Sequence, residues 1–179
     1  MKGILLSSLV SAALTGGWLL HNPHVVHVEI EKPQAELRAL VQRIAHDEKI
    51  PPALVKAVID VESSWDESNS ATKFEPHVAK VEGREGGTSY GAMQVMGYHA
   101  KKTCGLSSWA ELVGRANLEN NVRCGVKVLA NCVAWAAKKQ GTDDPIAVYD
   151  AALGCYNGDR ETYPRKVWVA LGKRALASG

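Results

Sequence analysis

The sequence of 179 residues has one phenylalanine, no internal repeat and no low-complexity tract. These absences exclude repeat proteins and low-complexity chains. An excess of one charge is also missing, because the formal net charge is +2 and the pI is about 8.3. Such a balance creates no strong field for polyanions, so we expect no nucleic-acid partner. The other aromatic residues are five Trp and five Tyr, whose rings with a polar edge suit carbohydrate grooves as well as cores.

Charged residues are absent from residues 3–20, which follow Lys2. This run is long for a signal peptide and just long enough to span a bilayer. It favours an uncleaved signal anchor in a bacterial membrane, with the remaining chain on the periplasmic side of the inner membrane. A cleaved signal peptide and a buried core helix are the alternatives. We therefore predict a signal anchor or signal peptide over 1–22, a linker over 23–33 and one globular domain over 34–179.

Four cysteines, Cys104, Cys124, Cys132 and Cys155, agree with an oxidising compartment in which two disulfides form. Cys124 and Cys132 share one predicted helix and lie roughly 12 Å apart by helix rise, too far for a bridge. Two pairings remain: Cys104–Cys124 with Cys132–Cys155, which is favoured, or Cys104–Cys132 with Cys124–Cys155. Reduced buried thiols are the alternative to both. The spacings resemble no zinc motif, so we expect no metal.

The hydrophobic pattern predicts a mainly α-helical domain with one irregular insertion. The insertion covers 66–89, where Ser, Asn, Gly and charged residues are typical of a long loop or a small β-like lobe. A second loop is predicted over 154–162. The predicted helices cover residues 35–47, 53–62, 91–102, 118–139, 145 to about 153, and 163–177.

One acidic residue lies on the apolar face of the helix predicted over 53–62. At about 100° per residue, Glu62 stacks over Val58 and Ile59 near the centre of the apolar arc. Desolvation penalises the charged form of Glu62 and raises its pKa, which suits a general acid. Asp60 lies with Lys56 on the opposite face, where we expect an ordinary surface carboxylate. A glutamate that caps a helix end or pairs with a buried arginine is the alternative for Glu62.

Three further segments follow the Glu62-Ser63 pair in a specific order. In the first, a glycine permits close backbone approach and a glutamine offers both a donor and an acceptor. The segments are Ser89-Tyr90-Gly91-Ala92-Met93-Gln94-Val95-Met96, Asn121-Val122-Arg123-Cys124-Gly125 and Cys155-Tyr156-Asn157-Gly158. Together with Glu62-Ser63, this order resembles the soluble lytic transglycosylase domain family of lysozyme-like fold, over about residues 35–170.

The resemblance implies roles for individual residues. Glu62 matches the catalytic acid, and Tyr156 matches a tyrosine that hydrogen-bonds near that acid. The candidate substrate-binding residues are Ser63, Ser89, Tyr90, Met93, Gln94, Tyr156 and Asn157.

The chain also departs from the family pattern. Ala92 replaces the usual leucine, and Gly158 follows Asn157 directly, which shortens that loop. The stretch 72–88 is longer than in compact members. It contains Phe74-Glu75-Pro76-His77-Val78, which is similar to phage cell-wall lysins.

The resemblance further implies cleavage, without a cofactor, of the β-1,4 bond between N-acetylmuramic acid and N-acetylglucosamine in peptidoglycan glycan strands. Glu62 protonates the glycosidic oxygen and then accepts the proton of the muramic 6-hydroxyl, which attacks C1 to give a 1,6-anhydro product. A goose-type-like muramidase is one alternative, with Glu75 or Asp66 as a second carboxylate. The other alternative is a non-catalytic peptidoglycan-binding component of a virion or secretion apparatus. A phage virion is accordingly the alternative location of the protein.

Overall fold

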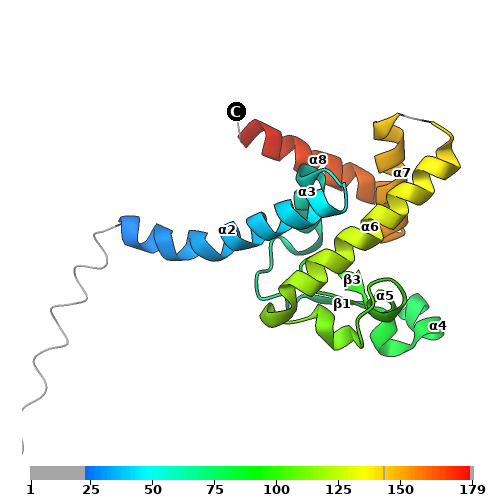
Figure 1. Ribbon diagram of the computed structural model, residues 1–179, viewed down its shortest axis with the longest axis horizontal. Helices are drawn as coiled ribbons and strands as arrows, with labels where there is room; N and C mark the ends of the chain where they lie inside the picture. The colour runs from blue at the N-terminus through cyan, green and yellow to red at the C-terminus, as the bar shows by residue number, and fades with distance from the viewer. Residues whose placement is uncertain (1–22, 143, 178–179) are drawn as a thin grey trace, which may run out of the picture. The chain divides into compact units, whose positions relative to one another are not determined.

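A computed structural model describes residues 23–142 and 144–177 (Figure 1). The chain divides into two units, Met1–Glu36 and Leu37–Gly179. The leader predicted over 1–22 lies outside the described residues. No helix within the described ranges combines the length and the apolar character that a bilayer span requires.

The first described element is α2 (Pro23–Asp47), which ends where the sequence predicts. Residues 23–33, for which a linker was predicted, belong to this helix, and their role as a linker stays a prediction. Pro23 suits a helix start because the first backbone N–H groups have no acceptor within the helix. Pro33 lies inside α2, where its fixed φ is compatible with helical geometry. Proline was therefore a poor boundary signal in this segment.

Four helices form the body of the unit Leu37–Gly179, and the predicted mainly helical fold is confirmed. α6 packs against α7, and α3 packs against α8 (Figure 1). Proline occupies the first turn of α3 and of α7, and the Asp144 side chain accepts a hydrogen bond from the Ile146 backbone N–H to cap α7. The bounds are α3 Pro52–Ser63, α6 Leu118–Gln140, α7 Pro145–Asn157 and α8 Thr162–Ala177.

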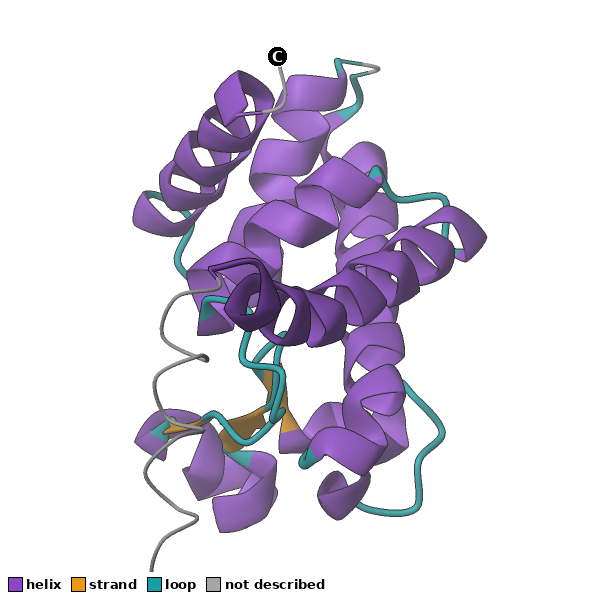
Figure 2. Ribbon diagram, turned by 90° about the vertical axis from the view of Figure 1, so that its left-hand side faces the viewer, coloured by secondary structure: helices purple, strands orange, loops and turns teal. Residues whose placement is uncertain are grey.

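A small antiparallel sheet with the strand order β1-β2-β3 lies at one end of this unit (Figure 2). The strands are β1 (Thr72–Phe74), β2 (Thr88–Tyr90) and β3 (Val95–Met96), and Ser89 pairs with both Lys73 and Met96. Between β1 and β2 lies α4 (Pro76–Gly86), and α5 (Gly97–Lys102) follows β3. Two short 3-10 helices, η1 (Trp109–Leu112) and η2 (Arg115–Asn117), lead into α6. The small β-like lobe predicted for the insertion is present, with α4 as an unpredicted addition.

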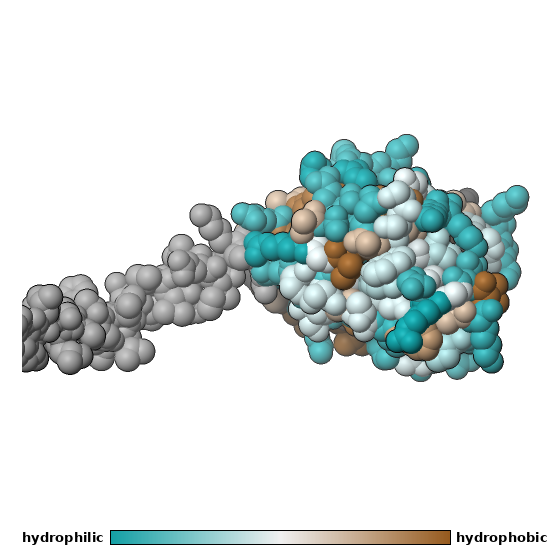
Figure 3. Space-filling model, turned by 90° about the horizontal axis from the view of Figure 1, so that it is seen from below, coloured by the Kyte–Doolittle hydropathy of each residue, from teal (hydrophilic) through white to brown (hydrophobic). Residues whose placement is uncertain are grey.

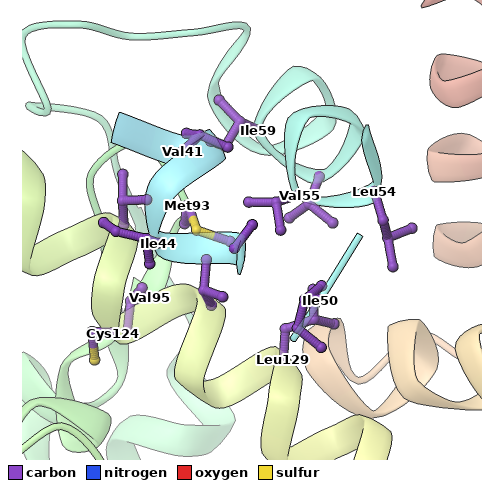
Figure 4. Packing of buried hydrophobic residues seen from close by; sticks show 14 of the residues in the cluster. Val41, Ile44, Ile50, Leu54, Val55, Ile59, Met93, Val95, Cys124 and Leu129 are labelled. Atoms are coloured by element: carbon purple, nitrogen blue, oxygen red, sulfur yellow. The ribbon is translucent and has the colours of Figure 1, made fainter. Parts of the chain in front are cut away.

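The core of the unit joins α2, α3 and α6 around the segment that follows β2. Figure 4 shows Met93 among Val41, Ile44 and Val55, and all four side chains are fully buried. Full burial of one such side chain contributes about 1.5–3 kcal/mol. The surface has a different character: on the face drawn in Figure 3, hydrophobic side chains form separate small areas within a largely hydrophilic or neutral surface.

Both disulfides have the favoured pairing. Cys104–Cys124 links the segment after α5 to α6, and Cys132–Cys155 links α6 to α7. The Cα atoms lie 5.3 Å and 5.8 Å apart, respectively. The second bridge therefore fixes the end of α7 next to Tyr156 and Asn157.

Two predicted boundaries are wrong. The helix expected over 91–102 begins only at Gly97, because Gly91 to Gln94 form a tight turn that leads into β3. The helix expected to end near residue 153 continues to Asn157, and Gly158 ends it in the left-handed conformation. Tyr156 and Asn157 therefore occupy the last turn of a helix rather than a loop.

Candidate active site

A cleft of about 690 Å³ lies between the small sheet and the ends of α3, α7 and α8. Polar and titratable side chains dominate its lining, which includes the three carboxylates of Glu62, Glu75 and Asp159 and two lysines. Its main polar residues are Glu62, Lys73, Glu75, His77, Ser89, Gln94, Tyr156, Asn157, Tyr163 and Lys166.

Glu62 lies in the last turn of α3, half-buried at the wall of this cleft. Burial desolvates its carboxyl group and raises its pKa above the ordinary value. The nearby hydroxyl of Tyr163 and the amide of Asn157, and then the charges of Lys73 and Lys166, act in the opposite direction. The predicted environment of Glu62 is therefore present, and four groups around it favour the carboxylate once the proton has left.

Asn157 is the candidate residue that the structure brings directly to the acid. Its side-chain Nδ2 lies 3.5 Å from Glu62 Oε1, and it donates to that oxygen. Because the helix α7 extends to Asn157, this amide comes from a fixed turn that is next to the Cys132–Cys155 bridge.

Tyr163 is a site residue that the sequence prediction missed. It lies in the first turn of α8 and is buried, and its hydroxyl has no partner within strict hydrogen-bond distance among the described residues. It nevertheless lies close enough to Glu62 to lower the pKa of that carboxyl, and burial together with the negative charge of Glu62 raises the pKa of the phenol. The signal in the sequence was the i,i+4 spacing of Tyr163 and Val167, which places the ring on the inward face of α8.

Gln94 is held rigidly in the cleft wall. Its Nε2 donates to the carbonyl oxygens of Ala71 and Gly91 at 3.1 and 2.9 Å. The hydroxyl of Ser89 lies 2.9 Å from Gln94 Oε1, which accepts its hydrogen. Both donors of the Gln94 amide are thus in use, so only an acceptor lone pair of Oε1 is left for a substrate.

Two buried amides fix the turn that carries Gln94. Asn69 Oδ1 accepts a hydrogen bond from the backbone N–H of Ala92 at 2.8 Å, and Asn121 Oδ1 accepts one from Met93 at 2.9 Å. Gly91 has φ +73, and a Cβ atom there would lie 2.1 Å from Asn69 Oδ1. The Asn121 motif is therefore a support for the site, and Asn69 is a second support that the sequence prediction missed.

Three candidate substrate-binding residues lie outside the lining of this cleft, and their role in binding stays a prediction. Met93 is fully buried in the core. Tyr90 stacks on Trp109 with ring centroids 5.1 Å apart, and its hydroxyl donates to a backbone carbonyl. Ser63 donates to the carbonyl oxygen of Ala92 at 2.8 Å, which ties the acid helix to the turn behind the cleft.

Tyr156 has a different partner from the one expected. It lines the cleft, but its hydroxyl donates to the carbonyl oxygen of Met93 at 2.7 Å and makes no hydrogen bond to Glu62. Burial raises the pKa of this phenol well above its ordinary value. Tyr156 therefore connects α7 to the turn that carries Gln94.

The two candidates for a second carboxylate differ in position. Glu75 lines the cleft and pairs with Lys73 at 2.7 Å and with His77 at 3.8 Å. Asp66 accepts hydrogen bonds from Ser68, Ser70 and the N–H of Ala71 within its own loop. Only Glu75 is therefore placed to meet a substrate in this cleft.

Asp60 is not the ordinary surface carboxylate that the helix pattern predicted. It forms a two-point ion pair with the guanidinium of Arg174 on α8 and accepts a hydrogen bond from Trp65 Nε1 at 2.5 Å. Lys56 instead donates to Gln42 at 3.2 Å. The helix phase was right for Glu62, but the face opposite to it is covered by α8 rather than by water.

The described residues contain no group of three His, Cys, Asp or Glu side chains arranged to hold a metal ion. The chemistry that the cleft can provide is proton transfer by Glu62, a half-buried acid whose pKa is raised by desolvation.

A comparison with known families gives a match that covers this site. A family model described as the transglycosylase SLT domain matches residues 39–165. The matched segment contains Glu62, Gln94, Asn157, Tyr163 and all four disulfide cysteines. No significant match was found among curated proteins or among solved structures.

Proposed function

The chain belongs to the transglycosylase SLT domain family of the lysozyme-like superfamily, and from this premise we propose that it is a peptidoglycan lytic transglycosylase with Glu62 as its catalytic acid. The observation that carries the proposal is the position of Glu62. It is a desolvated carboxyl at the wall of a cleft large enough for sugar rings, with an amide and a phenol beside it.

In the first step, the protonated Glu62 donates its proton to the glycosidic oxygen between N-acetylmuramic acid and N-acetylglucosamine. The C1–O bond breaks, the bonding electrons stay with the leaving oxygen, and positive charge develops at C1 of the muramic residue. The raised pKa supplies the protonated acid that this step needs.

In the second step, the Glu62 carboxylate accepts the proton of the muramic 6-hydroxyl. The freed oxygen attacks C1 and closes the 1,6-anhydro ring, so no water is consumed and Glu62 is protonated again. Asn157, Tyr163, Lys73 and Lys166 stabilise the carboxylate between the two steps, because each of them lowers the pKa of Glu62. The Oε1 atom of Gln94 is available to orient the substrate's acetamido N–H.

A muramidase is the second candidate function, because Glu75 lines the same cleft. In an inverting hydrolase, a second carboxylate activates a water on the far side of the sugar. Glu75 forms an ion pair with Lys73, which already neutralises the charge of the Glu75 carboxylate. This ion pair supports an electrostatic role for Glu75 in place of the activation of a water molecule. The non-catalytic alternative has less support, because a binding module has no need of a desolvated acid, whose burial destabilises its charged form.

Two variants and one product analysis test these alternatives on purified peptidoglycan sacculi. We expect Glu62→Gln to fold and to reduce turnover by about 10²–10⁴-fold, the usual contribution of general acid–base catalysis. Glu75→Gln is the matched control, and it should retain turnover within about tenfold. Mass spectrometry should find anhydro-muropeptides, each one water lighter than the product of hydrolysis.

Each contrary result selects another function. Turnover of Glu62→Gln near that of the wild type contradicts the catalytic role of Glu62. Hydrated products together with an inactive Glu75→Gln variant establish the muramidase, and binding without any released fragment establishes the non-catalytic role.

The proposed location is the periplasmic side of the inner membrane, with residues 1–22 as an anchor or signal peptide. The two disulfides support an oxidising compartment. A phage virion and a secretion apparatus remain alternative settings, in which the same enzyme opens the cell wall locally. Fractionation of cells that express the full chain tests the membrane assignment.

A further inference from the structure

A second hollow adjoins the catalytic cleft. We call it the α8 groove: it lies between α3 and α8, has a volume of about 460 Å³, and is lined by Asp60, Val61, Lys166, Val169, Ala170, Lys173, Arg174 and Ala177. Val61 and Lys166 line both the groove and the catalytic cleft. A ligand bound beside Glu62 can therefore extend directly into the groove.

The α8 groove carries a positive charge that the described fold does not neutralise. Arg174 is paired with Asp60. Lys166 and Lys173 are exposed and form no ion pair with another described residue. Between them lie apolar side chains, of which Val169 is 57% exposed. The groove thus offers two ammonium groups separated by an apolar strip, which suits a ligand with several carboxylates on a short aliphatic chain.

The proposed substrate has such a ligand attached to it. The muramic acid residue bears, on its 3-lactyl group, a short peptide with free carboxylates. Lys166 and Lys173 are two helical turns apart on α8, or roughly 10 Å along the helix axis. Four extended residues span about 13 Å, so a peptide that starts at the sugar beside Lys166 reaches Lys173.

We propose that the α8 groove binds the stem peptide of the muramic residue at the cleavage site, with Lys173 pairing with one of its distal carboxylates. This inference rests on the proposed peptidoglycan substrate and makes the enzyme selective for strands that still carry peptides. The groove contributes binding free energy, and the chemistry at Glu62 does not depend on it.

The test compares intact sacculi with glycan strands from which an amidase has removed the peptides. The variant is Lys173→Glu, because Lys173 lies outside the catalytic cleft, and a free lactyl carboxylate on stripped strands lies too near the sugar to reach it. The matched control is Lys127→Glu, the same charge change at an exposed lysine of α6 that lines neither the cleft nor the groove.

On peptide-bearing strands, we expect Lys173→Glu to raise KM about threefold to tenfold with little change in kcat, as an attraction between partly exposed charges becomes a repulsion. On stripped strands, the variant should match the wild type, and Lys127→Glu should match it on both. Equal losses on both substrates, or no loss on either, overturn the proposal.

Two additional measurements separate this proposal from others. Binding to sacculi and to stripped strands in a Glu62→Gln background reports on the groove even if the chain proves not to be a transglycosylase. Binding to vesicles that contain anionic phospholipid tests a membrane surface as the occupant. If Lys173→Glu weakens vesicle binding and leaves sacculus binding unchanged, the groove serves a lipid surface and the stem-peptide proposal is wrong.

Discussion

At the scale of single residues, the central feature is the balance of opposing effects on Glu62. Burial raises the pKa of its carboxyl, and four neighbours reduce that rise. The folded state therefore retains a proton at pH values where the unfolded chain has lost it. The contribution of Glu62 to stability is fully present below about pH 4.5 and is lost as the pH rises through its raised folded pKa. The proposed catalytic acid thus destabilises the fold at neutral pH.

The phenol of Tyr163 permits a test of this balance. Its hydroxyl lowers the pKa of Glu62, so Tyr163→Phe should raise that pKa further and move the alkaline limb of kcat/KM to higher pH. We expect kcat to fall about tenfold or more, because the phenol also stabilises the carboxylate between the two steps.

Stability distinguishes this effect from damage to the fold. The comparison is made below about pH 4.5, where Glu62 is protonated in both states and the hydroxyl has no carboxylate to stabilise. Because this hydroxyl is buried and no described residue lies within hydrogen-bond distance of it, its removal should then leave the free energy of unfolding unchanged or increase it by about 0.5–1 kcal/mol. A pH profile identical to that of the wild type, or a clear loss of stability, contradicts the assigned role.

At the scale of elements, the sequence predicted helices wherever an apolar stripe faces the core. The patterns of α3, α6 and α8 are local, so their bounds agree with prediction to within a residue or two. The helix α4 was missed because its glycines are typical of a loop, and one of them, Gly83, has a non-helical conformation inside the helix.

Contacts between distant residues explain the other errors. The segment 91–96 has helix-compatible residues, but the side chains of Asn69 and Asn121 accept the N–H groups of Ala92 and Met93. Gly154 reads as a helix breaker, yet α7 passes through it because the missing side chain gives room to Arg160, whose Cα would lie 3.0 Å from a Cβ there. The positions of Asn69, Asn121 and Arg160 next to these segments cannot be inferred from the local sequence.

The contact between α3 and α8 depends on Asp60, which was predicted to face water. Both side chains of the Asp60–Arg174 pair are about a quarter exposed, and Trp65 also donates to this carboxylate. We expect Asp60→Asn to lower the free energy of unfolding by about 1–3 kcal/mol, because it removes the negative charge from a two-point charged hydrogen bond with Arg174.

Chemical denaturation measures that change. Lys56→Ala is the control on the same helix, and it should change stability by less than about 0.5 kcal/mol, because Lys56 makes one exposed hydrogen bond to Gln42. Equal small effects of both variants would restore the original interpretation of Asp60 as a surface residue.

At the scale of the whole molecule, the cysteine pairing could be predicted only in part. Helix geometry excluded one of three pairings, and the choice between the other two depends on how α5, α6 and α7 pack. The cleft required even more long-range information, because its residues come from five separate segments. Family resemblance predicted Glu62, Gln94 and Asn157, which all line the cleft, whereas the contacts of Met93, Tyr90 and Ser63 behind the cleft are seen only in the fold.

The two bridges should contribute differently to stability and to activity. Their cysteines are 20 and 23 residues apart, and loops of that length correspond to about 3 kcal/mol each in the chain-entropy description. We expect Cys104→Ala/Cys124→Ala and Cys132→Ala/Cys155→Ala to lower Tm by similar amounts. Only the second pair should also reduce kcat well below Tm, because Cys132–Cys155 fixes the turn that carries Tyr156 and Asn157.

Thermal unfolding and sacculus turnover of the two double variants measure these effects, with the reduced wild type as a reference. A second pair whose turnover equals that of the first would show that α7 holds its end without the bridge.

The paired amides of Asn69 and Asn121 also determine how a glycan can enter. A movement of the small sheet away from α6 would break several buried hydrogen bonds of Asn69 and Asn121 at once. Each buried donor or acceptor that loses its partner costs about 1–3 kcal/mol. This energetic cost keeps the floor of the cleft in one conformation. Conformational adjustment is left to the edge of the cleft, where α4 has no buried residue. We therefore expect the proposed glycan substrate to meet a cleft floor that is already formed before binding, without an opening and closing movement of the small sheet.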